Sequence, residues 1–327
     1  MIRRIVSFIL FVALARLVVF APAAMAQRPT PENSQRLNLL ALGDWGGDTP
    51  QQKQVADEMA SLAVGKERPV EAALLLGDNF YMDLPKGTKS QEWQTVFEEV
   101  YDLKRMPFPF YAVLGNHDYE KPGKSQAELD YAREHPESRW KIPARWYRLD
   151  LPEKQPLVTL LMLDSNWHAM LAQQWDDEMH WLETELSKPR ESTWLLCAAH
   201  FPLFNNGLHG DDNRLKKDWG PLFKRANVDF YLCGHDHDLQ HLEIADWPTS
   251  FVISGGGGKS IYPILRSDRG PFAASSFGCV ALSFTPRLAT VTYYDAKGNT
   301  LHQFERTAEG KVTTTDRGRE SVPALKP

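Results

Sequence analysis

Short apolar runs of strand length recur along the chain and alternate with stretches whose apolar residues have a helical spacing. The helical spacing covers residues 51–64, 92–103 and 175–186. Strands that alternate with helices predict a layered α/β core in which loops at the carboxyl ends of the strands carry polar side chains. The predicted strands of this part of the chain are residues 37–42, 72–76, 110–114, 157–163, 194–199 and 228–233.

The pattern changes after residue 237. Residues 251–254, 279–284 and 289–294 look like strands without intervening helices, which predicts a second sheet packed on the first. Residues 120–146 are charged and aperiodic, and we interpret them as a long surface loop over the site. The run Gly255–Ser260 suggests a nucleotide-binding loop, but the first glycine of that motif would fall at position 253, which is isoleucine, so we predict a flexible connection instead.

The first residues have the features of an export signal. Arg3 and Arg4 precede an apolar run, and Ala24-Met25-Ala26 has the form of a signal-peptidase site. A retained membrane anchor is the alternative, although Arg16 interrupts the run and the flanking residues favour cleavage. We expect a periplasmic or secreted protein. The predicted organisation is a signal peptide (1–26), a linker (27–36), one catalytic domain (37–306) and a polar tail (307–327).

Charge and cysteine content narrow the possible partners. Cleavage would change the formal net charge from −5 to −8, because the signal segment contains three arginines and no acidic residue. A net acidic exported protein without a basic run is not built to bind nucleic acid or, after cleavage, an anionic membrane surface. Cys197 and Cys233 lie in apolar strand-like runs, so we expect buried thiols, with one oxidised cysteine pair as the alternative. We expect a monomer.

Side chains that bind metals follow five of the predicted strands. Asp78 and Tyr81 come after the strand at residues 72–76, and a carboxylate with a phenolate suits a ferric ion better than zinc or magnesium. Any one such residue could be an ordinary turn residue, but the repetition along one chain favours a shared site. Oxygen and imidazole donors without thiolate suit a pair of metal ions that one carboxylate can bridge. The strand ends offer Asp44, Asp78, Tyr81, Asn116, His117, His200, His235 and His237.

These strand ends resemble the metal-binding blocks of the calcineurin-like metallophosphoesterases. Tyr81 narrows the resemblance to the purple acid phosphatases, of the small tartrate-resistant type. The likeness extends from Leu37 to about Ser260 and implies an α/β fold, a two-sheet β-sandwich flanked by helices. The five blocks are Gly43-Asp44-Trp45-Gly46, Gly77-Asp78-Asn79-Phe80-Tyr81, Gly115-Asn116-His117-Asp118, His200-Phe201-Pro202 and Gly234-His235-Asp236-His237.

The resemblance also implies a role for each ligand. Asp78 would bridge two metal ions, a ferric ion and a second, divalent ion that is iron, zinc or manganese. A metal-bound hydroxide would attack the phosphate at acidic pH. The ferric ion would be held by Asp44, Tyr81 and His237, and the divalent ion by Asn116, His200 and His235.

Two histidines are candidates for protonating the leaving group. His117 stands beside Asn116, and His209 falls where the mammalian-type enzymes have a second active-site histidine. The chain departs from the family in two places. It is short between Asp164 and Trp175, where those enzymes carry a long protease-sensitive loop, and Asp238 replaces a common asparagine.

The sequence therefore predicts an exported acid phosphatase with a binuclear centre, acting on a small phosphomonoester or a phosphoprotein. Three alternatives stay open: a phosphodiesterase on the same metal pair, a non-catalytic phosphate- or phosphoprotein-binding module, and radical-producing redox chemistry at an iron pair. The complete set of expected ligands argues against a non-catalytic module. Both candidate acids, His117 and His209, favour monoesters.

Overall fold

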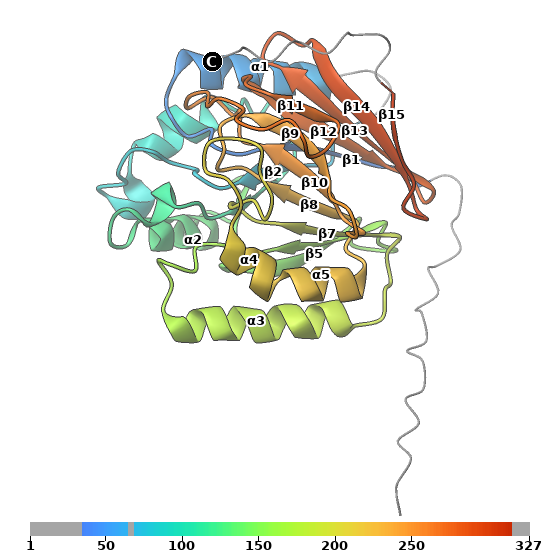
Figure 1. The fold of residues 1–327 in the computed structure, drawn as a ribbon. Coiled ribbons are helices and arrows are strands. Elements are labelled where there is room, and N and C mark those ends of the chain that lie inside the picture. Colours follow the sequence, from blue (N-terminus) through green and yellow to red (C-terminus); the bar gives the residue numbers. More distant parts are fainter. Residues whose placement is uncertain (1–34, 65–68, 316–327) are drawn as a thin grey trace, which may run out of the picture.

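Two β-sheets pack face to face and carry helices on their outer faces (Figure 1). The computed structural model describes residues 35–64 and 69–315. The predicted signal peptide, all but the last two residues of the predicted linker, and residues 316–327 of the predicted tail lie outside these ranges. Within the described ranges the predicted α/β sandwich is confirmed.

The first sheet has eight strands in the order β15-β14-β13-β12-β1-β2-β3-β4. Its parallel part is β1, β2, β3 and the short β4, so the carboxyl ends of these strands reach the same edge. β12 runs antiparallel to β1 on the other side. The bounds are β1 (Leu37–Leu42), β2 (Ala72–Leu76), β3 (Phe110–Val113), β4 (Trp140–Lys141), β12 (Gly278–Phe284), β13 (Leu288–Asp295), β14 (Thr300–Thr307) and β15 (Val312–Thr314).

The second sheet has seven strands in the order β11-β9-β10-β8-β7-β6-β5. Here β6, β7, β8 and β10 are parallel, while β5 and β9 pair antiparallel to their neighbours. The bounds are β5 (Tyr147–Leu151), β6 (Val158–Met162), β7 (Trp194–Ala198), β8 (Phe230–Cys233), β9 (Leu239–Glu243), β10 (Ser250–Ser254) and β11 (Phe272–Ala274).

The strands after residue 237 do not form a sheet of their own, so that prediction is wrong. β10 joins the second sheet beside β8, whereas β12 returns to the first sheet and pairs with β1, with Leu37 opposite Phe284. The physical reason is that β1 has one edge free after pairing with β2, and a strand edge left open exposes unpaired backbone groups. The predicted polar tail also begins too early, because β15 lies within it and pairs with β14.

Helices cover both outer faces. α1 lies over the first sheet, and α3, α4 and α5 lie below the second (Figure 1). α1 begins where Thr49 caps it, its hydroxyl accepting the N–H of Gln52, and proline occupies the first turn. The bounds are α1 (Pro50–Ala63), α2 (Lys124–Glu134), α3 (Ala172–Ser187), α4 (Asn213–Asp218) and α5 (Gly220–Ala226), with short helical turns η1 (Gly87–Lys89), η2 (Trp93–Glu98) and η3 (His117–Tyr119).

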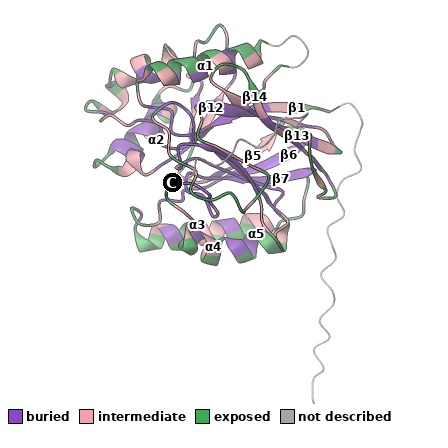
Figure 2. Cartoon of the chain, turned by 45° about the horizontal axis from the view of Figure 1, so that its top comes forward, coloured by how far each residue is buried: buried purple, intermediate pink, exposed green. Residues whose placement is uncertain are grey.

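The inner strands of the second sheet, β6, β7, β8 and β10, are buried on both faces. Along β6, Leu160 packs into the core between the sheets and Leu161 into the separate core beneath α3 and α5, as the alternation of side chains across a strand requires. Figure 2 shows the buried strands at the centre and the exposed outer faces of the helices. The cysteines, Cys197, Cys233 and Cys279, are all buried and free, which confirms the expected buried thiols.

Two predicted segments differ from the structure. Residues 92–103 contain only the six-residue π-helical turn η2, not a long helix. Residues 120–146 are not an irregular loop, because they form α2 and β4 and bury Tyr131 and Trp140 in the core. Trp93 of η2 stacks on Tyr131 with ring centroids 3.7 Å apart. The packing of these aromatic rings orders a segment whose sequence is too charged to show a helical period.

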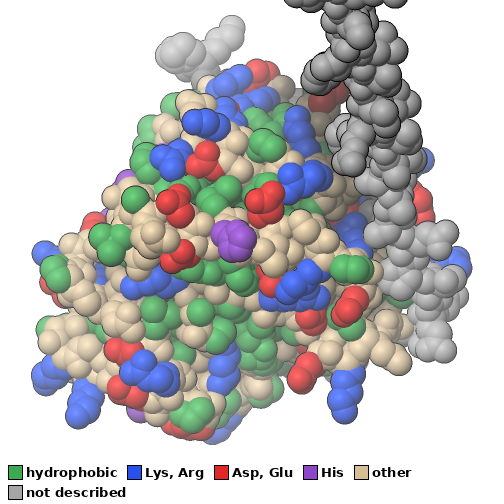
Figure 3. Space-filling model, turned by 90° about the horizontal axis from the view of Figure 1, so that it is seen from below, with side chains coloured by type: hydrophobic (Ala, Val, Ile, Leu, Met, Phe, Trp, Pro, Cys, Tyr) green, Lys and Arg blue, Asp and Glu red, His purple; other side chains and the backbone are tan. Residues whose placement is uncertain are grey.

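The surface carries mixed charge. On the face shown in Figure 3, basic and acidic side chains are interspersed among polar and apolar ones. Among residues 35–64 and 69–315, no helix has the length and apolar character needed to cross a membrane.

Candidate metal centre

The two sheets meet where the carboxyl ends of their parallel strands come together. Gly43 after β1 donates its N–H to the carbonyl of Ser254 at the end of β10, at 2.6 Å. A Cβ on Gly43 would stand 3.1 Å from the Cα of Gly234, which follows β8. Glycine therefore suits this close approach, and the loops of both sheets converge on one site.

Four predicted ligands of the ferric ion and its bridge lie together. Asp44, Asp78 and His237 are buried, and they offer donor atoms that all lie within 4.8 Å of one another. The phenol oxygen of Tyr81 is 3.3 Å from Oδ1 of Asp44 and 3.0 Å from Nε2 of His237. Two carboxylates, an imidazole and a phenol form a donor set that fits a hard, trivalent cation.

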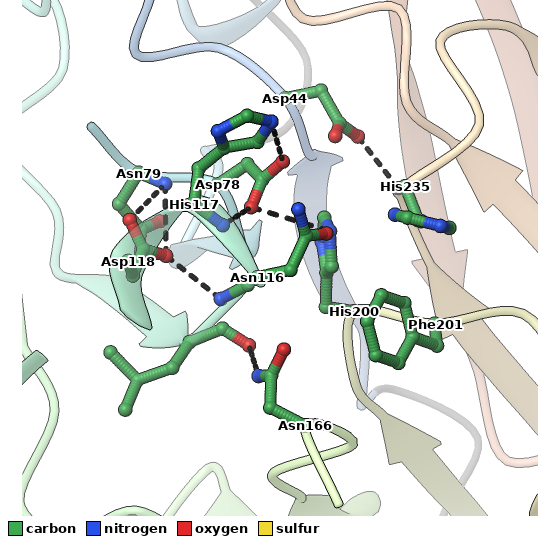
Figure 4. A network of polar contacts seen from close by, with 12 residues as sticks. Asp44, Asp78, Asn79, Asn116, His117, Asp118, Asn166, His200, Phe201 and His235 are labelled. Atoms are coloured by element: carbon green, nitrogen blue, oxygen red, sulfur yellow. Dashed lines mark hydrogen bonds and ion pairs between the residues drawn. The ribbon is translucent and has the colours of Figure 1, made fainter. Parts of the chain in front are cut away.

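The predicted ligands of the second ion lie on the other side of Asp78. Nε2 of His200 is 3.0 Å from Oδ1 of Asn116 and 3.4 Å from Oδ1 of Asp78. The other ring nitrogen of His200, Nδ1, lies 2.9 Å from the carbonyl of Leu76 and donates its proton there, so Nε2 is the nitrogen that faces the site and would bind a metal ion after losing its proton. Figure 4 shows Asp78 between His117 and His200, with Asn116 alongside.

His235 completes this side through its backbone and ring. Its N–H donates to Oδ2 of Asp44 at 2.8 Å, and its ring centroid lies 5.1 Å from that of His200. The ring also packs edge-on against Phe201 (Figure 4). Asp78 thus lies between two groups of donors, which is the arrangement that a bridging carboxylate requires.

Three of the predicted ligands have backbone angles that side chains rarely adopt. Asp44, Asp78 and His235 have φ of 60°, 51° and 70°. Each left-handed residue other than glycine costs about 1–3 kcal/mol, and such residues gather at functional sites. The sharp turn that this conformation makes at the end of a strand aims each side chain back toward its neighbours.

The charges of the site depend on one another. Burial opposes ionisation of Asp78, but the imidazoles of His200 and His117 hold its pKa well below the usual range. Burial alone would lower the pKa of His200, whereas the Asp78 and Asp44 carboxylates raise it to about 9. Burial, followed by Asp44 and Asp78, raises the pKa of Tyr81 well above 10. The cluster is thus an acidic site that a cation would neutralise.

The two candidate acids stand at the rim of this cluster. His117 is about one-third exposed, with Nε2 3.8 Å from Oδ2 of Asp78 and Nδ1 2.7 Å from the Glu120 carboxylate. His209 lies on the opposite side, where its ring centroid is 4.2 Å from that of His235 and its Nδ1 is 3.0 Å from the buried carboxylate of Asp236. All the predicted site residues are therefore brought together, and their roles stay predictions.

Sequence reasoning missed a buried polar cluster behind Asp78. The carboxylate of Asp118 accepts the N–H groups of Gly115, Asn79 and Phe80, which fixes the loops that carry Asn116 and Asp78. The Asn79 amide donates to the buried Glu128 of α2 at 2.9 Å. Asp118 could have been found from its place in the third block, whereas Glu128 lies in a segment without any sequence signal.

Lys124 is a second residue that the sequence did not reveal. Its side chain is 3% exposed, and Nζ donates to the carbonyls of Phe80 at 2.6 Å and His117 at 2.8 Å. It therefore joins the second and third blocks from the first turn of α2.

This fold and this cluster define a class of protein. The model of the calcineurin-like phosphoesterases matches residues 37–239, which is more than half of the chain. The chain belongs to this family, and membership implies a binuclear metal centre.

Within the family, its relatives are purple acid phosphatases. The tartrate-resistant acid phosphatase type 5 of Oryctolagus cuniculus is 33% identical over 297 residues, which cover 81% of this chain and 89% of the relative. The human enzyme of that name is 31% identical over 296 residues, with the same coverage. Purple acid phosphatase 4 of Arabidopsis thaliana is 29% identical over 300 residues, 86% of each chain.

Solved structures agree on the fold. Purple acid phosphatase PPD1 from yellow lupin superposes with a TM-score of 0.66 at 16% identity, covering 86% of this chain and 55% of that one. GAP50, described as the anchor in the inner membrane complex of Plasmodium, superposes with a TM-score of 0.70 at 22% identity, covering 82% of this chain and 87% of its own. At these identities the likeness concerns the fold alone.

Proposed function

We propose that this protein is an exported acid phosphatase that hydrolyses phosphate monoesters at a binuclear centre of Fe(III) and a divalent iron, zinc or manganese ion. The observation that carries the proposal is the position of Tyr81. Its phenol oxygen lies 3.0 Å from Nε2 of His237 and 3.3 Å from Asp44, beside a carboxylate placed to bridge. A tyrosine among the donors is the feature that favours ferric iron over a site for zinc or magnesium alone.

Each half of the site would hold one ion. Asp44, Tyr81 and His237 would bind the ferric ion, and Asp78 would bridge to the divalent one. When bound, the metal pair would neutralise the phosphate oxygens and supply a nucleophile derived from water. The second ion would be held by Asn116, His200 and His235.

The protein's own side chains would orient the ester and supply the proton that the leaving group needs. His117 is partly exposed and borders Asp78, so an ester oxygen at the site would lie within its reach. Its Nδ1 lies 2.7 Å from the Glu120 carboxylate, a contact that orients the ring. His209, held by the buried Asp236, would serve a leaving group that projects to the other side.

The cellular location of the protein is proposed from its sequence. Arg3 and Arg4, the apolar run and the Ala24–Ala26 site support export to the periplasm or the medium. We propose a monomer that acts on a small phosphomonoester or a phosphoprotein. Amino-terminal sequencing of the exported protein should begin at Gln27, whereas a membrane-retained chain that begins at Met1 would contradict cleavage.

The test compares a monoester with a diester. Purified protein is assayed with p-nitrophenyl phosphate and with bis(p-nitrophenyl) phosphate between about pH 4 and pH 8, with metal analysis on the same sample. We expect monoester turnover with an acidic optimum, and Asp78→Asn should abolish it together with metal binding. A diester preference would replace the proposal with a phosphodiesterase. Metal binding without turnover of either ester would replace it with a binding module.

A further inference from the structure

The glycine-rich segment at residues 255–262 is ordered against the site, contrary to the flexible connection that the sequence predicted. Gly257 donates its N–H to the carbonyl of Gly43 at 3.0 Å, and Lys259 donates its N–H to the carbonyl of Asp44 at 3.1 Å. A Cβ on Gly257 would stand 2.2 Å from the Gly43 carbonyl oxygen. The glycines therefore allow this segment to lie directly on the loop that carries Asp44.

The same segment holds His237 from two sides. The hydroxyl of Ser260 lies 2.6 Å from Nδ1 of His237, which leaves Nε2 facing Tyr81. The Tyr262 ring stacks on the His237 ring, with centroids 4.1 Å apart and planes inclined by 7°. Tyr262 also donates its N–H to the carbonyl of His237 at 3.0 Å. Residues 255–262 thus form a wall along the half of the site that contains Tyr81.

Lys259 carries the only charge of this wall. Its Nζ lies 4.5 Å from the centroid of the Tyr81 ring. The side chain is exposed, and among the described residues its ammonium group contacts the Tyr81 ring and forms no ion pair. Because the ammonium group is not held in an ion pair, it is free to lie over the aromatic ring, on which its field then acts.

We propose that Lys259 is a positioning residue that acts through Tyr81: its ammonium group stabilises the electrons that the Tyr81 oxygen shares with a ferric ion. The inference rests on the proposed ferric centre. A cation over the ring face attracts its π-electrons, and the attraction grows when the ring bears the negative charge of a phenolate. The cation therefore lowers the energy of the electrons that Tyr81 donates, and it also favours reduction of the nearby ion.

Two observable quantities follow from this contact. A phenolate bound to ferric iron absorbs visible light as an electron passes from the ring to the metal. The ammonium group lies over the ring, and the ion would lie beyond the phenol oxygen, so the charge lowers the energy of the ring electrons more than that of the metal orbital that receives the electron. The band therefore lies at shorter wavelength with the charge present, and loss of the Lys259 charge should move it to longer wavelength. Loss of a positive charge should also lower the Fe(III)/Fe(II) midpoint potential, because the more highly charged oxidised state is then relatively favoured.

The experiment compares variants of the iron-loaded protein. Lys259→Met and Lys259→Gln should both shift the band to longer wavelength and lower the potential, whereas Lys259→Arg should keep both values near those of the wild type. The matched control is Lys224→Met, because Lys224 lies at the same 4.5 Å from the centroid of the Trp247 ring, on another part of the protein. The control should change neither value.

The outcomes separate this inference from the proposed function. An unchanged band and potential in both neutral variants would overturn the inference while leaving the ferric centre intact. Loss of iron from the neutral variants but not from Lys259→Arg would support the role of the charge, and loss from all three would refute it. A wild-type protein without a visible band would overturn the ferric centre and this inference together.

Discussion

The phenol oxygen of Tyr81 lies 3.0 Å from Nε2 of His237, although 156 positions separate the two residues in the chain. One follows a strand of the first sheet and the other a strand of the second, so the contact depends on the packing of the two sheets. Burial, Asp44 and Asp78 together keep the pKa of Tyr81 high. A cation that binds here must therefore displace the phenol proton, which makes the metal site and the fold interdependent.

The identity of the proton donor predicts a dependence on the leaving group. His117→Asn and His209→Asn should keep their metal, because neither histidine is among the proposed ligands. Turnover of an alkyl phosphate should fall by about 10²–10⁴-fold in the variant that lacks the true acid. p-Nitrophenyl phosphate should be less affected, since its leaving group departs without a proton.

The measurement is kcat for both esters with metal content determined on each variant. Equal losses for the two esters would contradict the assignment of a general acid. His200→Asn is the contrasting variant, and it should lose metal as well as activity.

Gly77 packs so closely against His200 that a side chain at this position should disturb the site. It has φ of 89°, and a Cβ there would stand 2.6 Å from Nδ1 of His200, the atom that bonds to Leu76. Gly77→Ala should displace the imidazole and weaken binding of the divalent ion in addition to the strain of about 1–3 kcal/mol. Isothermal titration with Mn²⁺ or Zn²⁺ measures the loss.

Gly123 provides the control for this substitution. Its φ is 81°, and nothing lies within 4 Å of a Cβ built there. Gly123→Ala should therefore show the backbone strain alone, as lower thermal stability with unchanged metal affinity. Equal metal affinities for the two variants would show that the Gly77 contact does not hold His200 in place.

Lys124 predicts a stability effect that reaches the site. Its ammonium group donates to the carbonyls of Phe80 and His117, and its charge lowers the pKa of Asp118 and of Glu128, against the burial that raises both. Lys124→Met leaves the two carbonyls without their donor and removes the buried cation nearest Asp118, and it should cost about 3–5 kcal/mol in the free energy of unfolding. Chemical denaturation measures this free energy. The control is Lys121→Met, which removes an exposed lysine. A cost no larger than that of the control would contradict the account.

Glu128 predicts a specific dependence of stability on pH. Burial and then the Asp118 carboxylate raise its pKa well above the ordinary value. The folded state therefore keeps a proton that the unfolded state releases, and the contribution of Glu128 to stability falls as the pH rises above about 4.5. Glu128→Gln removes this dependence, so the variant should gain stability relative to the wild type from pH 5 to pH 8.

Denaturation of the metal-free protein at a series of pH values tests this difference. Glu134→Gln, an exposed position on the same helix, should run parallel to the wild type. If the stability of Glu128→Gln also follows the same pH dependence as the wild type, the buried proton belongs to another group and the prediction is wrong.

The candidate ligands could be predicted because each stands just after a strand whose apolar run is plain in the sequence. Asp44 and Asp78 follow β1 and β2, and those strands have the bounds that the pattern predicts. Parallel strands bring such ends to one edge, so local patterns were enough to collect the site.

The features that the sequence did not reveal depend on contacts between distant segments. α2 buries Lys124 and Glu128, and charged residues at buried positions hide the helical period. The pairing of β12 with β1 joins residues more than two hundred positions apart, and no local pattern specifies the partner. The sequence predicts a flexible connection at the wall that contains Lys259, because a run of glycines looks the same whether it is free or packed against another backbone.

The central claim is that Tyr81 binds a ferric ion, and the visible absorption spectrum of the purified protein beside that of Tyr81→Phe tests it most directly. We predict a broad band in the middle of the visible range for the wild type, together with bound iron, and loss of the band in the variant. A colourless wild type without iron that hydrolyses esters only with added manganese or zinc would contradict the claim. The protein would then be a metallophosphoesterase that uses metals other than iron.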